Sequence, residues 1–280
     1  DALARFPAAL AQTPDDPETR HAAALACLSQ GDFIGGWPGF ALRLHADPRP
    51  PTETRLRQPR WTGAEPLAGQ RILLYAERSL EDALHFLRYV PMVAGLGARV
   101  RLRVQPALHP LAAAMPALAD NPEIQLDDPG ASRAQFDLRC ALADLPAAFG
   151  TTLPTIPAVV PYLAPPPELA AGWQSVLQPG SPRIAIAWVG AATSAGMPGS
   201  TLPPPVLGAL LDALAAALPT ARLHALGPPD PTAEPVLDRF PALLDLRPNT
   251  PDAGNLAAAL ARMDLVIAAD GPILHLAGAL

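Results

Sequence analysis

Apolar residues recur in short runs along the chain, and the period of these runs changes once. From residue 2 to about residue 46 they follow a helical period, broken at a Pro-Asp-Asp-Pro turn at residues 14–17 and at Gly31-Asp32. From residue 71 onward, short apolar runs alternate with longer stretches of helical period. The pattern predicts a helical segment followed by an α/β region with a mainly parallel sheet.

The α/β region divides at a proline-rich stretch, residues 151–167, which is typical of an extended linker. Ahead of it we expect strands at residues 71–76, 98–104, 123–126 and 136–140, with helices at 81–94, 108–118 and 142–149. Behind it we expect strands at residues 183–189, 222–226, 243–246 and 264–269, with helices at 204–218 and 252–263. Two doubly wound domains of this kind place a ligand cleft at the carboxyl ends of their strands.

The helical segment has the size and punctuation of the last unit of a tetratricopeptide array. It is either a scaffold for a protein partner or a packing cap on the next domain. Because a solenoid needs about three repeats for independent stability, the packing cap is the favoured interpretation. The expected domains are residues 1–52, 53–165 and 166–280, and the helical pattern that simply stops at Leu280 predicts that the last domain is incomplete.

Net charge, lysine content and cysteine spacing limit the classes of function that the chain can have. A net charge of −6 over 280 residues argues against a general nucleic-acid coat. The sequence has no lysine, so any anion held by a side-chain cation is held by arginine. Cys27 and Cys140 are in no metal-like or CxxC spacing and are interpreted as small buried residues in a reducing compartment. No apolar run reaches the length of about 18 residues that spans a bilayer.

Three turns carry candidate chemistry, the first of which follows the strand at residues 71–76. Asp82, at the start of the next helix, is either a general base toward a hydroxyl or a capping acid. His85, one turn further on, orients an acceptor or is only a surface residue. Glu81 beside Asp82 makes the turn acidic.

The second turn follows the last expected strand. Gly271 followed by Pro272 favours the start of a helix, and the free backbone amides near residues 271–274 can point at a diphosphate. Asp270 would then contact a sugar hydroxyl, with His275 on the first helical turn. The alternative is an ordinary strand-to-helix turn with a capping Asp and a packed His.

The third turn, residues 188–200, is a loop of small residues after a strand. Small residues let backbone amides approach a phosphate. The loop matches neither GxGxxG nor the P-loop pattern and carries no cation, so by itself it is a weak signal.

Together these pieces resemble bacterial glycosyltransferases of the heptosyltransferase-like class, fused behind tetratricopeptide repeats. The matching residues run in the expected order over nearly the whole chain. They are Gly31-Asp32-Phe33 with Trp37, then residues 59–61, 67–69, 72–77, 82–91, 97–100, 105–106, 149–152, 155–157, 161–163, Trp188 with Gly190, residues 264–267, Asp270 and residues 275–280.

The resemblance implies a GT-B arrangement of two Rossmann-like domains. The first domain would bind the acceptor, with Asp82 as catalytic base and Arg78 and His85 beside the acceptor. The second would bind a nucleotide-diphosphate sugar, without an essential metal or a cofactor. The donor-side residues would be Trp188, Gly190, Thr193, Asp270, Gly271, Ile273 and His275.

The chain departs from the family pattern at both motifs. Where the family usually reads Gln-Gly-Leu-Gly-Asp-Thr, residues 78–83 read Arg-Ser-Leu-Glu-Asp-Ala, so both glycines are replaced by side chains. In the loop at residues 191–200 the family carries Asn, Lys, Asp and Arg, whereas this chain carries no charge. Lost charge-assisted contacts at about 1.5 to 3 kcal/mol each would weaken donor binding unless another arginine, such as Arg78, compensates.

Two hypotheses follow from these departures. The chain is either a metal-independent glycosyltransferase acting on a glycan or protein hydroxyl, or a degenerate member that serves as a binding or adaptor module through its helical front end. An unrelated nucleotide-binding domain has little support. We expect no nucleic-acid partner, no transmembrane segment, and a cytoplasmic location, with attachment to the face of the inner membrane as the alternative.

Overall fold

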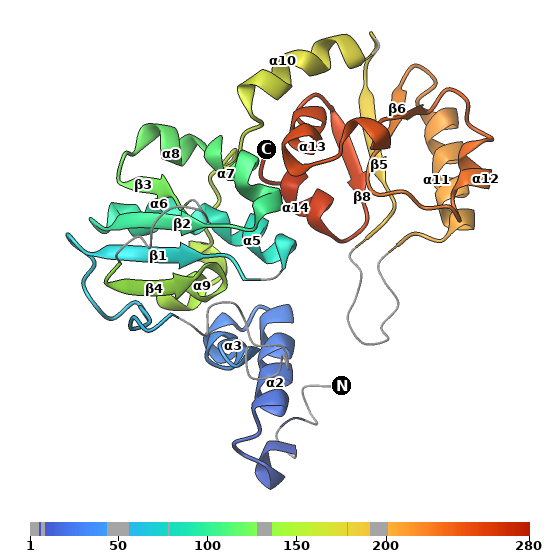
Figure 1. The fold of residues 1–280 in the computed structure, drawn as a ribbon. Coiled ribbons are helices and arrows are strands. Elements are labelled where there is room, and N and C mark those ends of the chain that lie inside the picture. Colours follow the sequence, from blue (N-terminus) through green and yellow to red (C-terminus); the bar gives the residue numbers. More distant parts are fainter. Residues whose placement is uncertain are drawn as a thin grey trace. The chain divides into compact units, whose positions relative to one another are not determined.

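The computed structural model describes residues 6, 9–43, 56–77, 79–127, 136–177, 179–190 and 201–280. By its internal contacts the chain forms two compact units, Asp1–Val104 with Pro122–Val159 and Gln105–Asn121 with Val160–Leu280. Figure 1 labels their helices and strands. Each unit contains one four-stranded sheet, and all strand pairs are parallel, which confirms the predicted α/β class. The domain boundaries expected at residues 52/53 and 165/166 stay predictions.

The first unit is built on four strands in the order β3-β2-β1-β4. Ile72, Leu73 and Leu74 in β1 are fully buried, as expected for an inner strand of a parallel sheet covered on both faces. In β2 the side chains alternate, with Val100 and Leu102 buried and the arginines between them at least partly exposed. The strands are β1 (Arg71–Tyr75), β2 (Arg99–Arg103), β3 (Ile124–Leu126) and β4 (Leu138–Ala141).

The second unit repeats the same strand order, β7-β6-β5-β8. Its central strand β5 pairs with β6 on one side and with β8 on the other. A cluster of buried side chains, with Trp188, Leu207 and Leu211 as its largest members, packs around β5 and its following helix. The strands are β5 (Arg183–Ala187), β6 (Arg222–Ala225), β7 (Leu244–Asp245) and β8 (Leu265–Ala268).

Two helices expected to be continuous are each divided by proline. The helix predicted at residues 81–94 is α5 (Leu80–Phe86), a 3-10 turn η2 (Leu87–Tyr89) and α6 (Val90–Gly95). Pro91 lies in the first turn of α6, where its missing N–H costs no helical hydrogen bond. The helix predicted at 108–118 is likewise divided into a 3-10 turn η3 (Pro106–Leu108), α7 (His109–Ala113) and α8 (Pro116–Asp120). The prediction of unbroken helices was therefore wrong at both places.

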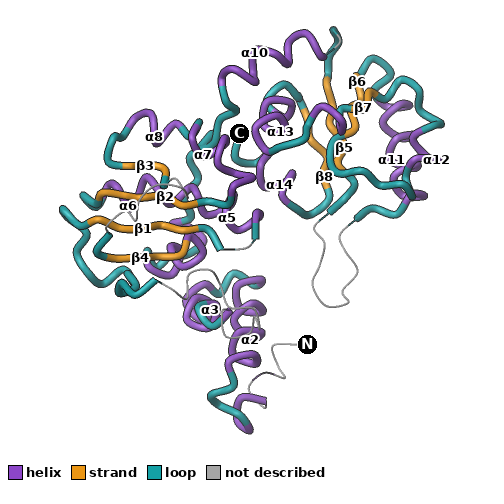
Figure 2. The backbone as a smooth tube through the Cα atoms, in the orientation of Figure 1, coloured by secondary structure: helices purple, strands orange, loops and turns teal. Residues whose placement is uncertain are grey.

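The other helices of the second unit lie around its sheet, as Figure 2 shows by colour. α11 and α13 occupy the two expected positions, whereas α10 and α12 were not anticipated from the sequence. The predicted linker contains a 3-10 turn, η5 (Leu153–Thr155), and otherwise irregular backbone up to α10. The elements are α10 (Pro167–Val176), α11 (Pro204–Ala217), α12 (Glu234–Leu237), a 3-10 turn η6 (Arg247–Asn249), α13 (Ala253–Leu260) and α14 (Pro272–Ala277).

The helical segment contains a closely packed pair, α2 (Pro17–Ser29) and α3 (Phe33–Phe40). Asp16 caps α2 and Asp32 caps α3, each by accepting a backbone N–H bond. A Cβ built on Gly39 would lie 2.6 Å from the Ala24 Cβ, so glycine permits the close approach of the two helices. The kinship of this pair with tetratricopeptide repeats stays a prediction.

Other parts of the first unit follow β4 directly. A 3-10 turn η4 (Leu142–Asp144) runs into the short helix α9 (Leu145–Ala148).

The two cysteines form no disulfide with each other. Cys140 is buried and Cys27 is half-buried, and both are free thiols. Within the described ranges, no helix is long and apolar enough to cross a membrane.

Candidate functional site

The carboxyl ends of β1 and β4 form the natural site edge of the first unit. From β1 the chain runs outward to β2 and β3 on one side of the sheet, and then returns to place β4 on the other side of β1. The boundary between β1 and β4 is therefore the topological switch point. Glu77 follows β1 and Asp144 ends the turn η4 after β4. Two acidic side chains therefore stand where a ligand of a doubly wound sheet is expected.

The predicted base, Asp82, lies in the first turn of α5. Ser79 caps this helix, and its Oγ accepts the backbone N–H of Asp82 at 2.9 Å and donates to Oε2 of Glu81 at 3.0 Å. Asp82 is half-buried, and its charge contributes to raising the pKa of Glu77. The structure thus places Asp82 beside the switch point, in a position that is also favourable for a helix-start acid.

Of the two residues predicted beside the acceptor, the structure describes one. His85 lies on α5 with Asp82, is half-buried, and packs its ring at 4.8 Å from that of Phe86. Arg78 lies outside the described residues. Their proposed contact with an acceptor stays a prediction.

An arginine from the helical segment holds both switch-point acids. Nε and Nη2 of Arg43 donate to the two carboxylate oxygens of Glu77 at 2.8 and 3.0 Å, and Nη1 donates to Asp144 at 2.7 Å. The side chains of these three residues are only 11–13% exposed. Asp144 also accepts a hydrogen bond from Arg60, whose side chain is 39% exposed. The four side chains form a compact network of two cations and two anions, which we call the switch-point network.

Burial and charge act in opposite directions on this network. Burial raises the pKa of Glu77 above its ordinary value, the hydrogen bonds and charge of Arg43 limit that rise, and the negative charges of Asp144 and Asp82 add to it. Burial disfavours the charged form of Arg43, but Asp144 and Glu77 outweigh it and raise the pKa of the guanidinium. Arg43 is therefore a permanent cation in a largely enclosed place.

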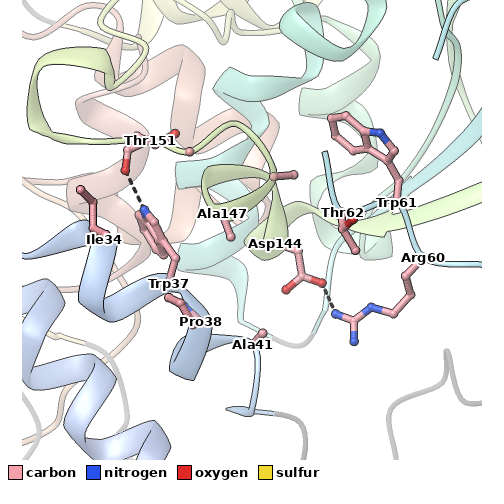
Figure 3. Close-up of a pocket in the computed structure, with 12 residues that line it drawn as sticks. Ile34, Trp37, Pro38, Ala41, Arg60, Trp61, Thr62, Asp144, Ala147 and Thr151 are labelled. Carbon is pink, nitrogen blue, oxygen red and sulfur yellow. Dashed lines mark hydrogen bonds and ion pairs between the residues drawn. The ribbon is translucent and has the colours of Figure 1, made fainter. Parts of the chain in front are cut away.

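A pocket of about 510 Å³ adjoins the network, and Figure 3 shows the side chains that line it. One wall is α3, and the others come from the turn before β1 and from the region around α9. Most of the lining is apolar, and Arg60 and Asp144 are its charged members. The lining residues are Ile34, Trp37, Pro38, Ala41, Arg60, Trp61, Thr62, Asp144, Ala147, Ala148, Gly150 and Thr151.

Two close contacts fix the walls of this pocket. The indole N–H of Trp37 donates to the carbonyl oxygen of Thr151 at 2.7 Å, which ties α3 to the segment after α9 (Figure 3). Gly63 has φ of +98°, and a Cβ there would lie 2.0 Å from the carbonyl oxygen of Ala148. Only glycine fits this position, because both its backbone conformation and its space exclude a side chain.

In the second unit, the predicted donor residues follow β5 and β8, which are adjacent strands. Trp188 is 1% exposed and its indole N–H donates to Oδ2 of Asp230 at 3.0 Å. The N–H of Gly190 donates to the Thr201 hydroxyl at 3.2 Å. Thr193 and the rest of residues 191–200 lie outside the described residues.

The turn after β8 contains the remaining donor candidates. Asp270 is exposed, Gly271 precedes α14, and His275 is half-buried within this six-residue helix. The amides of Leu274 and His275 both point at the carbonyl oxygen of Gly271, at 3.1 and 3.4 Å, so they close the turn. Ile273 is buried, and a Cβ on Gly227 would lie 3.4 Å from its Cδ1, which brings the turns after β6 and β8 together.

Arg247, which was not predicted as a site residue, lies at the same carboxyl edge of the second sheet. Arg247, after β7, has a side chain only 8% exposed and stands 5.3 Å from the centre of the Trp188 ring. It donates to Asp245 and Glu234 at 2.8 Å. The hydrogen bonds of Asp245, opposed by burial and aided by Glu234, raise the pKa of Arg247. This arginine is already engaged by two carboxylates.

Sequence reasoning missed Arg43, Asp144 and Arg247 as site residues. Of these three, Arg43 was the easiest to suspect, because a single arginine in the apolar stretch at residues 33–44 suggests a buried ion pair. Its partners lie 34 and 101 positions away in the chain, and no local pattern connects them. In the described part of the chain, no cluster of three or more His, Cys, Asp or Glu residues is arranged to hold a metal ion.

No protein-family model and no curated protein matches the chain. Among solved structures, one similar to it is a glycosyl transferase of family 9 from Veillonella parvula, with 12% identity, coverage of 77% of this chain and 79% of that chain, and a TM-score of 0.58. The chain therefore has a fold similar to that of this structure. Two structures of the Escherichia coli heptosyltransferase WaaC, one with ADP-2-deoxy-2-fluoro heptose and one with ADP, are 13% identical over 75% of this chain and 85% and 84% of theirs, with TM-scores of 0.48 and 0.49. At sequence identities of 12% and 13%, these likenesses are evidence about the fold alone.

Proposed function

We propose that the protein is a glycosyltransferase-like protein that transfers a sugar from a nucleotide-diphosphate sugar to a hydroxyl of a glycan or protein, without a metal ion. The supporting observation is the likeness to the Veillonella structure, which covers 77% of the chain and therefore takes in parts of both units. The location we propose is the cytoplasm, at the face of the inner membrane or free of it.

Asp82 is the proposed base on the acceptor side. Its carboxylate would take the proton of the acceptor hydroxyl, and the oxygen would then attack the anomeric carbon of the donor sugar. The bond from that carbon to the diphosphate breaks with its electron pair, so the nucleoside diphosphate leaves and Asp82 retains the proton. Arg78 and His85 would orient the acceptor.

The donor side is proposed at the carboxyl edge of the second sheet. Trp188, Gly190 and Thr193 follow β5, and residues 270–275 follow the adjacent strand β8. The local charge opposes anion binding, because residues 181–280 contain five arginines against eight acidic residues. The nucleotide would have to bind largely through backbone amides, stacking and apolar contacts.

The second candidate is a binding or adaptor module with a glycosyltransferase fold. Its specific support is that Arg43 and Arg60 neutralise Glu77 and Asp144 at the switch point, and that Arg247 is neutralised by Asp245 and Glu234. Charges that are matched within the chain are not available to a charged substrate. In this alternative the helical segment would bind a protein partner.

Calorimetric titration with ADP, UDP and their sugar conjugates distinguishes the two candidates. The enzyme proposal expects binding at millimolar ligand or better, and transfer that persists in EDTA. Asp82→Asn should abolish transfer while nucleotide binding remains, and Asp15→Asn, at an almost fully exposed acid, serves as the matched control. An absence of nucleotide binding would contradict the enzyme proposal, and unchanged turnover in Asp82→Asn would exclude that residue as the base.

A further inference from the structure

The pocket between α3 and α9 has a chemistry that the proposed transfer reaction does not use. It belongs entirely to the first unit and is lined by three segments far apart in the sequence. Its volume of about 510 Å³ lies in the range of small-molecule sites. Trp37, Ile34 and Ala147 give it apolar walls, and Arg60 with Asp144 gives it one polar side (Figure 3).

Arg60 supplies the polar recognition in this pocket. Within the described part of the chain its guanidinium is hydrogen-bonded only to Asp144, through Nη2, although a guanidinium has five N–H donors. Its side chain is 39% exposed, so the remaining donors can reach a ligand. An occupant that offered no acceptors would bury these donors unpaired, at a cost in free energy.

The charge of the polar side argues for a neutral occupant. Arg43 and Arg60 balance Glu77 and Asp144, so the switch-point network has no net charge to attract an anion or a cation. The occupant must combine an apolar face with groups that both donate and accept hydrogen bonds. A sugar ring has both, since its C–H face packs on an indole and its hydroxyls bond to either partner.

The walls disfavour a peptide as the occupant. Backbone addition of an extended peptide needs an unpaired strand edge, whereas the backbone of α3 and α9 is engaged in helical hydrogen bonds. A docked helix, apart from its last turn, would bring no free backbone acceptors to Arg60. The apolar wall of Ile34, Trp37 and Pro38 is therefore matched better by a ring with hydroxyls.

We infer that the pocket lined by Trp37, Arg60 and Ala147 is a binding site for a neutral saccharide. This inference rests on the proposed function for the choice of ligand class, and it adds a saccharide subsite on the helical segment. Arg60 donates to ring hydroxyls, and Trp37 provides the surface for the apolar face of the ring. The helical segment then takes part in recognising the saccharide acceptor.

Two variants test the pocket by different means. Ala147→Phe fills it from α9, where Ala147 is exposed, without removing any side chain of the switch-point network. Arg60→Met removes the free donors while Asp144 keeps its bond from Arg43. Ala22→Phe, at an exposed position of α2 outside the pocket lining, is the matched control. Circular dichroism and thermal unfolding establish that each variant is folded.

The probes are the methyl glycosides of glucose, galactose, mannose and N-acetylglucosamine, with glucuronate and a neutral amphipathic helical peptide as competing classes. Binding is measured without nucleotide, by calorimetry and by tryptophan fluorescence. We expect at least one neutral glycoside to bind the unaltered protein and Ala22→Phe, with an affinity loss of at least about tenfold, or about 1.4 kcal/mol, in Ala147→Phe and Arg60→Met.

Failure to bind any neutral glycoside, stronger binding of glucuronate or of the peptide, or equal affinity in all variants would overturn the inference. Nucleotide titrations on the same samples separate this result from the proposed function. Nucleotide binding without glycoside binding would contradict only the saccharide pocket. Glycoside binding without nucleotide binding would support the pocket and contradict the transferase.

Discussion

Arg43 of the helical segment and Glu77, which follows β1, form a two-pronged ion pair, with N–O distances of 2.8 and 3.0 Å. Both side chains are 11% exposed. Planar, doubly hydrogen-bonded pairs of this kind are the strongest that arginine makes with a carboxylate. Because Asp144 binds the same guanidinium, one residue of the helical segment satisfies both acids at the switch point.

Arg43→Met is expected to destabilise the protein by about 3 to 5 kcal/mol, since it leaves two enclosed carboxylates without their main counter-charge. Urea denaturation followed by tryptophan fluorescence measures the loss. The matched control is Arg20→Met, because Arg20 is 48% exposed and stands 4.0 Å from an exposed Asp15. That control should change stability by less than about 0.5 kcal/mol. Equal losses in the two variants would show that the Arg43 pair contributes no more than a surface pair.

Gly63→Ala is expected to cost about 2 to 4 kcal/mol, because the added Cβ meets the Ala148 carbonyl oxygen and the residue has a left-handed backbone. Gly69→Ala separates these two causes. Gly69 also has a positive φ, of +75°, but no heavy atom lies within 4 Å of the place that an added Cβ would occupy. We expect about 1 kcal/mol there, from backbone strain alone. If thermal unfolding gives the same loss for both, the close approach to Ala148 is not a constraint.

His224, within β6, is expected to make stability depend on pH. Burial lowers the pKa of its imidazole below the ordinary value, so the unfolded chain binds a proton more readily than the folded one. Stability is therefore fully present above about pH 6.5 and falls as the pH drops through and below that value, by at most about 1.4 kcal/mol per pH unit.

His224→Leu should remove this part of the pH dependence. The side chain is 1% exposed and its Nδ1 has no hydrogen-bond partner in the described part of the chain, so leucine can fill the space without breaking a bond to that atom. Urea midpoints measured between about pH 7.5 and pH 5 provide the comparison. Parallel curves for the two proteins would mean that His224 does not titrate differently on unfolding.

Arg247→Met is expected to cost about 1 to 3 kcal/mol, because it breaks two ion pairs and the contact with the Trp188 ring at a largely buried position. Arg239→Met is the matched control. Arg239 also has a carboxylate partner, Asp212, and an aromatic one, Phe240, but its side chain is 57% exposed. Its loss should stay below about 1 kcal/mol. Thermal unfolding measures both losses, and a larger loss in the control would contradict the assignment.

Much of the fold could be predicted from the sequence because local patterns determine it. The continuous apolar run of β1 and the alternation of β2 identified both strands to within a residue at each end. The predicted helices were too long where Pro91 and Pro116 lie in the first turn of new helices. Proline cannot continue the preceding helix but is well tolerated in the first turn of the next. The apolar period continues across such a break and hides it.

The candidate site was predictable only in part, for a physical reason. Asp82 and His85 share one helix turn, so their proximity follows from the helical period. The bond from Arg43 to Asp144 joins residues 101 positions apart, and the stacking of Arg247 on Trp188 depends on strand order. Such contacts arise from the tertiary fold, and no spacing in the sequence expresses them.

The bond between Arg43 and the switch-point acids limits how freely the parts of this protein can be exchanged. A different helical array placed before the α/β region would have to present an arginine at the same point, or Glu77 and Asp144 would lose that bond. The proline- and arginine-rich sequence at residues 47–60 therefore marks a change in composition and not a boundary at which modules can be exchanged. Any exchange of modules must therefore keep Arg43 together with the first sheet.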